Sequence, residues 1–309
     1  MSTLFPIVPR TTVAVVGLGG IGSVIAAALQ HADRHDVVAC ARRPLDQLIL
    51  ERPEGTVAVR LRSVTDPAAA TPVDWVLICT KAHHTPSCAP WLARLCGPST
   101  RVAVLQNGID HTGRLAPFVG AATVVPTIVY YNGERLADDR VRLRYATDHE
   151  LAARDDGDGR AFARLLDGAV MRVLLSADLD TLAWRKLLMN VVANPLTALT
   201  LQRQAVLRRD DMRSLCLAIF EEAVAVGRAA GAHFEDDVVA RSLATLMTYP
   251  EAAGTSMYFD RLAGRSLEVE ALTGAVVAAG VRHGIATPLN RMLLTLLRAI
   301  SDAAETPGG

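Results

Sequence analysis

The sequence predicts an α/β protein in which an N-terminal, Rossmann-type doubly wound sheet precedes an all-helical C-terminal domain. Three observations support this fold class. A short β-branched run at residues 11–16 leads directly into a glycine-rich turn and then into an alanine-rich helix. Apolar runs of strand length recur up to about residue 175, as expected of parallel strands buried on both faces. From residue 178 onward the apolar spacing is that of successive helices, so we expect domains at residues 1–177 and 178–309.

Composition limits the classes of function. The chain has 309 residues, of which 50% are hydrophobic and 21% charged, which is typical of globular domains rather than of disordered chains. Lys+Arg and Asp+Glu number 32 each, so no basic excess indicates binding to nucleic acid or to a membrane surface. No apolar run reaches the length of about 18 residues that a membrane span needs. The five cysteines contain no CxxC pair, which indicates reduced thiols in a cytoplasmic protein and no zinc or other metal site.

The turn after the first strand has the spacing of a dinucleotide-binding fingerprint, in the order Gly17, Leu18, Gly19, Gly20, Ile21 and Gly22. Gly17 permits a tight turn, Gly19 lets the backbone approach a pyrophosphate, and Gly22 lets the helix pack closely on the strand. The N-terminus of the following helix supplies free N–H groups and a favourable dipole. The alternative is a glycine-rich turn without a ligand, but strand and helix both stand where the fingerprint requires them.

The residues after the second strand, expected at 36–41, indicate which dinucleotide binds. An NAD-binding domain usually carries Asp or Glu about 20 residues beyond the glycines, where it bonds the ribose 2′-hydroxyl. This chain has Arg42 and Arg43 instead. A guanidinium fork matches a phosphate, so NADPH/NADP⁺ is favoured over NADH/NAD⁺. The alternative is a pair of solvated arginines in a loop.

Two further strands end in polar residues. The apolar run at 74–80 is followed by Lys81, and the run at 101–105 is followed by Gln106, Asn107 and Gly108. Ligands of open α/β sheets bind beyond the carboxyl ends of the strands. Lys81 and Asn107 are therefore candidates for contact with cofactor or substrate, the alternative being an ordinary loop role for each.

The other elements are expected in the following order. Residues 122–131 and 140–146 alternate in hydrophobicity around a turn at Gly133, which predicts antiparallel strands appended to the parallel sheet. A helix at 158–170 and a short strand at 171–175 complete the first domain. Proline and glycine residues then separate helices expected at 179–194, 211–230, 235–247, 262–281 and 288–304.

The first helix of the second domain carries a polar stripe. Lys186, Asn190 and Asn194 recur at i, i+4 and i+8, which places them on one face of an otherwise apolar helix that Pro195 ends or kinks. Buried polar groups need a partner, so the stripe indicates contact with a side chain, water or ligand. The alternative is a solvated stripe with Lys186 extending outward.

A second polar group consists of Ser256 and, twelve residues later, Glu268. Taken alone, Ser256 is a cap or loop hydroxyl, and Glu268 is a carboxylate that complements the dipole at the start of an apolar helical run. Together with the earlier motifs, however, they resemble the ketopantoate reductase (2-dehydropantoate 2-reductase) family over nearly the whole chain. The resemblance rests on the order and spacing of the glycine turn, Lys81, Gln106-Asn107-Gly108, Trp184-Arg185-Lys186, Asn190, Asn194-Pro195, Ser256-Met257, Glu268, and Pro288 with Asn290.

The resemblance implies that the Rossmann domain binds NADPH and that the helical domain holds a 2-keto acid, which is reduced at C2. By position, Lys186 would be the general acid, and Glu268 would hold substrate and tune the lysine. The residues that would hydrogen-bond substrate are Asn107, Asn190, Asn194 and Ser256. Lys81 and Asn107 would lie near the nicotinamide and ribose. Partial burial would lower the pKa of the lysine, while a carboxylate at Glu268 would resist that shift.

Several alternatives stay open. The enzyme could reduce another 2-keto or 3-keto acid, because residues 132–154 and 200–203 depart from the family pattern. A histidine could be the acid, since His83 and His84 follow one strand end and His111 follows Asn107. The chain could also be a non-catalytic NADP(H)-binding sensor, although an intact set of site residues argues against this. Apolar surface on the helical domain would permit a homodimer.

Overall fold

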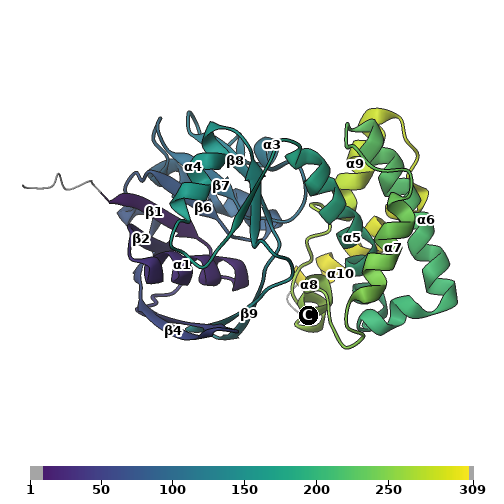
Figure 1. Cartoon of the computed structure of the whole chain (residues 1–309), viewed down its shortest axis with the longest axis horizontal. Coiled ribbons are helices and arrows are strands. Elements are labelled where there is room, and N and C mark those ends of the chain that lie inside the picture. The colour runs from purple at the N-terminus through teal and green to yellow at the C-terminus, as the bar shows by residue number, and fades with distance from the viewer. Residues whose placement is uncertain (1–9, 306–309) are drawn as a thin grey trace, which may run out of the picture. The chain divides into compact units, whose positions relative to one another are not determined.

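The computed structural model describes residues 10–305, which divide into two compact units (Figure 1). The first unit contains the chain up to Gln106 and residues His111–Ala177. The second contains Asn107–Asp110 and the chain from Asp178 onward. The chain therefore contributes a short segment, which we call the 107–110 excursion, to the helical unit well before that unit begins in sequence.

The first unit is built on an eight-stranded sheet with the strand order β12-β11-β8-β7-β6-β1-β2-β5. All neighbouring strands are parallel except β8 and β11, which are antiparallel. The central strands are apolar and completely buried at most positions, as the β-branched runs predicted. The strands are β1 (Thr11–Val16), β2 (His35–Cys40), β5 (Arg62–Val64), β6 (Trp75–Ile78), β7 (Arg101–Val104), β8 (Thr123–Val129), β11 (Leu151–Arg154) and β12 (Val173–Ser176).

Short helices connect these strands and cover the sheet. The helix α4 begins where the Asp156 carboxylate accepts hydrogen bonds from the backbone N–H groups of Asp158 and Gly159. Its buried Phe162 packs against Trp75 of β6. The helical elements of this unit are α1 (Gly20–Ala32), η1 (Pro67–Ala69), η2 (Ala82–Cys88), α2 (Ala89–Leu95), α3 (His111–Leu115) and α4 (Gly157–Leu165).

A second, four-stranded sheet covers α1. Its order is β4-β3-β10-β9, formed by β3 (Gln47–Arg52), β4 (Gly55–Arg60), β9 (Asn132–Ala137) and β10 (Arg140–Arg144). The helix α1 lies between the two sheets (Figure 1), and its residues 24–29 are completely buried. Helix and small sheet meet closely at two glycines, because a Cβ atom on Gly20 would lie 1.9 Å from the carbonyl oxygen of Gly133.

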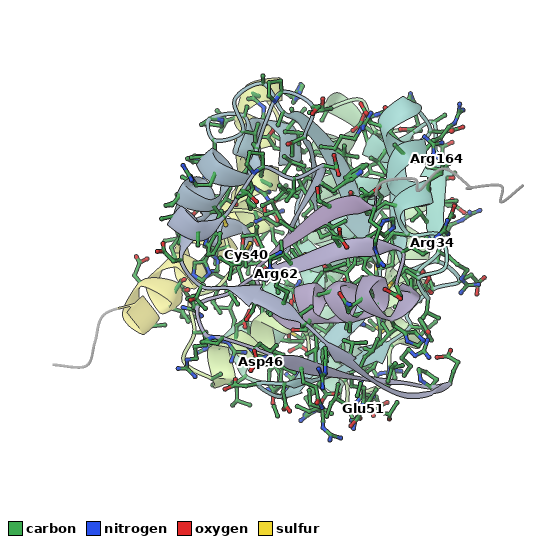
Figure 2. The ribbon with its side chains drawn as sticks, turned by 90° about the vertical axis from the view of Figure 1, so that its left-hand side faces the viewer. Arg34, Cys40, Asp46, Glu51, Arg62 and Arg164 are labelled. Atoms are coloured by element: carbon green, nitrogen blue, oxygen red, sulfur yellow. The ribbon has the colours of Figure 1, made fainter. Side chains whose placement is uncertain are left out.

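Alternation on the small sheet separates core from surface. Val141 and Leu143 of β10 are buried, whereas the arginines that alternate with them form ion pairs. Arg140 and Arg142 both contact Glu51, at 3.0 and 2.7 Å. Glu51 lies on the side of the sheet that faces away from α1 (Figure 2). Such exposed pairs contribute little stability, so the buried face positions the sheet.

The small sheet corrects one prediction. Residues 122–131 and 140–146 do not form one antiparallel pair on the main sheet. Instead β8 runs parallel to β7, whereas β10 pairs with β9 in the other sheet. The tight turn of this hairpin lies at residues 138–139 rather than at Gly133. Gly133 is needed for the approach to α1, so its role is close packing and not chain reversal.

The second unit is helical and is centred on α5 (Leu179–Thr200), whose residues 191–198 are all buried. The Asp178 carboxylate caps α5 by accepting the N–H of Thr181 at 3.1 Å. The other helical elements are η3 (Gln204–Arg208), α6 (Asp210–Ala229), α7 (Val238–Thr248), α8 (Ser256–Leu262), α9 (Thr273–His283) and α10 (Pro288–Glu305). Within residues 10–305, no helix has both the length and the apolar character needed to cross a membrane.

Two helix predictions are corrected. The helix α5 continues through Pro195 to Thr200, because burial of its C-terminal half outweighs the loss of one backbone hydrogen bond. The helix expected at 262–281 begins only at Thr273. Residues 256–262 form the separate helix α8, which Thr255 caps and which ends before Gly264 at a φ of +62°. Glu268 therefore lies in the loop between α8 and α9 and not in a helix.

Candidate active site

The glycine-rich turn fits a dinucleotide. Gly17 has a φ of +94°, and a Cβ there would lie 2.7 Å from Thr80 Cγ2, so only glycine is accommodated. A Cβ on Gly22 would lie 1.9 Å from the Gly17 carbonyl oxygen. By contrast, a Cβ on Gly19 would meet nothing within 4 Å, so the space beside it is open to a ligand. The helix α1 begins at Gly20 without a side-chain cap, which leaves its first N–H groups for an anion.

The three cationic candidates of the first unit stand at strand ends. Arg42 and Arg43 follow β2 and are exposed, and Arg43 is 3.7 Å from the exposed Asp138, a weak pairing. Lys81 follows β6, is half-buried and immediately precedes η2. Both arginines are thus available for a phosphate group.

In the second unit, one carboxamide joins the predicted acid to the predicted carboxylate. The Lys186 ammonium donates to Asn107 Oδ1 at 3.2 Å. Asn107 Nδ2 donates in turn to Glu268 Oε2, also at 3.2 Å. Because one end of the carboxamide accepts and the other donates, its orientation is fixed by its two charged neighbours. Glu268 is only 5% exposed, whereas Lys186 and Asn107 are half-buried, so the lysine reaches a buried carboxylate through a partly buried carboxamide.

The electrostatics of Lys186 suit proton transfer. Burial lowers its pKa from 10.5 to about 8, and the Glu268 carboxylate opposes that shift. With this pKa, roughly nine-tenths of the side chain is ammonium at pH 7. The group is therefore charged near neutral pH but gives up its proton more readily than an ordinary lysine.

The two other carboxamides of the α5 stripe bond each other. Asn194, which is 4% exposed, donates from Nδ2 to Asn190 Oδ1 at 3.3 Å. Its Oδ1 accepts from the backbone N–H of Met257 at 3.5 Å. The adjacent Ser256 is the exposed first residue of α8. Thr255, which caps α8, is also hydrogen-bonded to α5, since its hydroxyl lies 2.8 Å from the hydroxyl of Thr197.

The predicted residues thus fall into two sets. Those that the structure places in the helical unit are Asn107, Lys186, Asn190, Asn194, Ser256 and Glu268. Those of the first unit are the glycine turn, Arg42, Arg43 and Lys81. Of the histidines considered as the general acid, His111 is buried and donates from Nε2 to the Gln106 carbonyl at 3.0 Å, which makes it a structural residue.

Two features escaped the sequence reasoning. Gln106 is 4% exposed and lies at the centre of a hydrogen-bond network, whereas sequence reasoning assigned it no role beyond its place at a strand end and in the Gln106-Asn107-Gly108 motif. In addition, Lys81 and Lys186 are the only two lysines in the sequence, beside 30 arginines. That composition is itself a signal, because a lysine can have its pKa tuned by burial whereas an arginine cannot.

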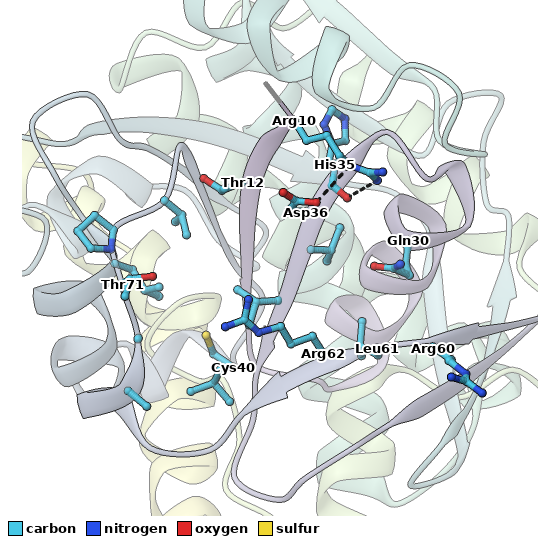
Figure 3. Close-up of a pocket in the computed structure, with 18 of the residues that line it drawn as sticks. Arg10, Thr12, Gln30, His35, Asp36, Cys40, Arg60, Leu61, Arg62 and Thr71 are labelled. Carbon is cyan, nitrogen blue, oxygen red and sulfur yellow. Dashed lines mark hydrogen bonds and ion pairs between the residues drawn. The ribbon is translucent and has the colours of Figure 1, made fainter. Parts of the chain in front are cut away.

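A cavity of about 670 Å³ in the first unit is separate from these residues. It runs along β2 and β5 and is lined by Arg10, Asp36, Cys40 and Arg62 among others (Figure 3). Arg10 is held at its rim by Asp36, at 3.2 Å. Burial raises the pKa of Cys40 to about 12, so this thiol is no nucleophile near neutral pH. None of the residues predicted to bind nucleotide or substrate lines the cavity.

A dinucleotide turn on a doubly wound sheet, together with a lysine of lowered pKa in a helical unit, defines the class of NAD(P)-dependent oxidoreductases. Across residues 10–305, no three His, Cys, Asp or Glu side chains are grouped so as to hold a metal ion.

Comparison with known proteins identifies the family. Residues 13–155 match the family "Ketopantoate reductase PanE/ApbA", and residues 178–301 match "Ketopantoate reductase PanE/ApbA C terminal". The 2-dehydropantoate 2-reductase of Caulobacter vibrioides is 37% identical over 292 residues, which cover 94% of this chain and 99% of that one. The chain belongs to the ketopantoate reductase family.

Solved structures agree with this assignment. A PanE/ApbA family ketopantoate reductase from Ralstonia eutropha superposes with a TM-score of 0.86 at 29% identity, covering 96% of this chain and 100% of that one. A dimeric ketopantoate reductase from Staphylococcus aureus superposes with a TM-score of 0.83 at 25% identity, covering 95% and 99%. The doubly wound first unit and the helical second unit predicted from the sequence are confirmed.

Proposed function

We propose that this chain reduces 2-dehydropantoate (ketopantoate) to pantoate with NADPH, a step in the synthesis of pantothenate and hence of coenzyme A, and that Lys186 is the general acid. The observation that carries the proposal is the hydrogen-bonded line from Lys186 through Asn107 to Glu268 in a chain of this family. The name of the Caulobacter vibrioides relative supports the choice of substrate.

The side chains of the second unit account for the proton. When bound, NADPH supplies the hydride that reduces the C2 ketone. The ketone oxygen gains negative charge as the carbonyl bond is reduced, and the Lys186 ammonium stabilises that charge and then donates its proton. The product is the C2 alcohol, and Lys186 is left as a neutral amine. Its pKa of about 8 brings the acid close to neutral pH, where proton transfer is most effective.

Asn107 and Glu268 hold the acid in place. Asn107 Oδ1 accepts from the ammonium, and this orients a side chain that is otherwise flexible. Glu268 keeps enough of the lysine protonated despite its burial. Asn190, Asn194 and Ser256 supply neutral donors for the carboxylate and hydroxyl groups of substrate, which need hydrogen bonds without more net charge.

The first unit holds the cofactor. The backbone of residues 17–22 and the N-terminus of α1 receive the pyrophosphate. Arg42 and Arg43 bind the 2′-phosphate, and this interaction selects NADPH over NADH. Lys81, which follows β6, would lie near the ribose and nicotinamide.

The test is steady-state NADPH oxidation with 2-dehydropantoate and a panel of other 2-keto and 3-keto acids. Lys186→Ala should lose on the order of 100-fold or more in kcat while NADPH still binds, as followed by its fluorescence. The matched control is Arg185→Ala, which removes the neighbouring cation of the same helix, whose partner is Glu235. Turnover retained in Lys186→Ala would remove the general-acid role, and equal activity on all keto acids would remove the assigned substrate.

We further infer a cytoplasmic homodimer. The Staphylococcus aureus relative is dimeric. The apolar side chains of Met292 and Leu296, one turn apart on α10, are about half exposed and would be covered by a second copy. Light scattering during gel filtration measures the mass, and Leu296→Glu should give monomers if α10 forms the interface.

The cytoplasmic location is inferred from the cysteines. All five are free thiols, which suits a reducing compartment.

A further inference from the structure

The 107–110 excursion begins and ends in a buried polar network of the first unit. The chain leaves that unit after Gln106, at the end of β7, and returns at His111, the first residue of α3. His111 Nε2 donates to the Gln106 carbonyl oxygen at 3.0 Å, so the two ends of the excursion are tied to each other. Both residues are buried, at 4% and 6% exposure.

The Gln106 side chain uses both of its ends. Its Nε2 donates to Thr80 Oγ1 at 3.1 Å and to Thr85 Oγ1 at 3.0 Å. Its Oε1 accepts from the Arg114 guanidinium of α3 at 3.0 Å. A carboxamide supplies two donors and an acceptor in one plane, which is what these three neighbours require.

The partners of Gln106 flank the candidate cofactor residues. Thr80 and Thr85 lie on either side of Lys81, and the Thr85 hydroxyl donates to the Ala82 carbonyl at 2.8 Å. Thr80 also lies directly against the glycine turn, where a Cβ on Gly17 would meet its Cγ2. One carboxamide therefore fixes the segment that carries Lys81, and the next residue in the chain is Asn107, which holds Lys186.

We propose that Gln106 is a positioning residue of the reaction: its buried network holds the start of the excursion so that Asn107 meets Lys186 and Glu268. The inference rests on the proposed function, because it assigns Gln106 to the placement of the proposed acid. Gln106 touches no reacting atom and acts through Asn107. A small displacement of an acid at the moment of proton transfer is costly, so the effect should appear mainly in kcat.

Gln106→Met tests this, since methionine has a similar length but offers no strong hydrogen-bonding group. We expect kcat to fall on the order of 10- to 100-fold with a smaller change in the KM for NADPH. Gln106→Glu keeps the acceptor for Arg114 but loses both donors to the threonine hydroxyls, so it should recover only part of the activity. The matched control is Thr100→Val, which removes buried hydrogen bonds to Val73 and Gly97 at the opposite end of β7. It should lower the melting temperature without lowering kcat.

A double-mutant cycle separates positioning from stability. If Gln106 acts through Asn107, then Gln106→Met should cost little further kcat in an Asn107→Ala background. Additive losses, or a kcat for Gln106→Met equal to that of Thr100→Val, would overturn the proposal.

A readout without turnover distinguishes this proposal from the proposed function. With only two lysines in the chain, the ¹³Cε signal of Lys186 can be followed directly. Its chemical shift should change in the Asn107→Ala and Gln106→Met variants but not in Thr100→Val. A wild type that fails to oxidise NADPH would refute the proposed function alone. A Lys186 chemical shift that is the same in Gln106→Met as in the wild type would refute the positioning role alone.

Discussion

Replacing Glu268 with glutamine should shift the alkaline limb of the pH profile to lower pH. Burial lowers the pKa of Lys186 to about 8, and the Glu268 carboxylate opposes this shift. Because reduction uses the proton of the ammonium form, kcat/KM of the wild type should fall as pH rises through about 8. Glutamine keeps the shape of the side chain but removes its charge. The ammonium then loses a stabilising neighbour, so its pKa falls further.

The size of the shift follows from the Asn107 bridge. Both contacts of that carboxamide are 3.2 Å long. With the width of the carboxamide added, the two charges are no more than about 9 Å apart, and at an effective dielectric constant of about 20 they attract by about 2 kcal/mol. This energy corresponds to slightly more than 1 pKa unit, so the midpoint should move from about 8 to about 7. At pH 8 the variant would hold roughly a tenth of its lysine as ammonium, against half in the wild type.

The assay is the pH dependence of kcat/KM for 2-dehydropantoate between about pH 5.5 and 9.5, since this parameter reports the groups of the free enzyme. Any substrate contact made by Glu268 appears as a loss that is the same at every pH, and so is separated from the shift. The control is Glu270→Gln, because that nearby carboxylate is exposed and pairs with Arg298. A midpoint that stays in place, or that moves to higher pH, would refute the account of how the lysine is tuned.

Two further predictions concern the first unit. Arg42→Ala and Arg43→Ala together should raise the KM for NADPH roughly 10- to 100-fold and leave the KM for NADH nearly unchanged, because only the contacts with the 2′-phosphate are lost. Parallel titrations with the two cofactors measure both values. An equal effect on both cofactors would contradict this prediction. Gly20→Ala should lower the free energy of unfolding by about 1–3 kcal/mol in denaturant titrations, because its Cβ would overlap the Gly133 carbonyl. Gly19→Ala, whose Cβ meets no neighbouring atom, should stay within about 0.5 kcal/mol of the wild type and weaken NADPH binding instead.

Periodicity and residue chemistry were enough to predict the main framework. The i, i+4, i+8 spacing placed Lys186, Asn190 and Asn194 on one face of α5, and the structure joins Asn190 to Asn194 and holds Lys186 through Asn107. The strand, glycine turn and helix at residues 11–32 could be predicted equally well, because the positive φ of Gly17 is a local requirement for glycine.

The features that were not predicted depend on contacts distant in sequence. Alternation in residues 47–60 was a usable strand signal, but the pairing of β3 with β10 joins segments about 90 residues apart. The helix α5 runs past Pro195 because of tertiary burial that propensity does not report. Likewise, nothing local distinguishes Gln106 from any other polar residue after a strand, since its role arises from Thr80, Thr85 and Arg114.

The most direct test of the central claim is the pKa of Lys186 itself. Protein labelled with ¹³Cε-lysine should give two side-chain signals, one for Lys81 and one for Lys186, and Lys186→Arg assigns them by deletion. The account predicts that the Lys186 signal titrates near pH 8. A Lys186 signal that titrates near 10.5, the value of an ordinary lysine, would contradict it.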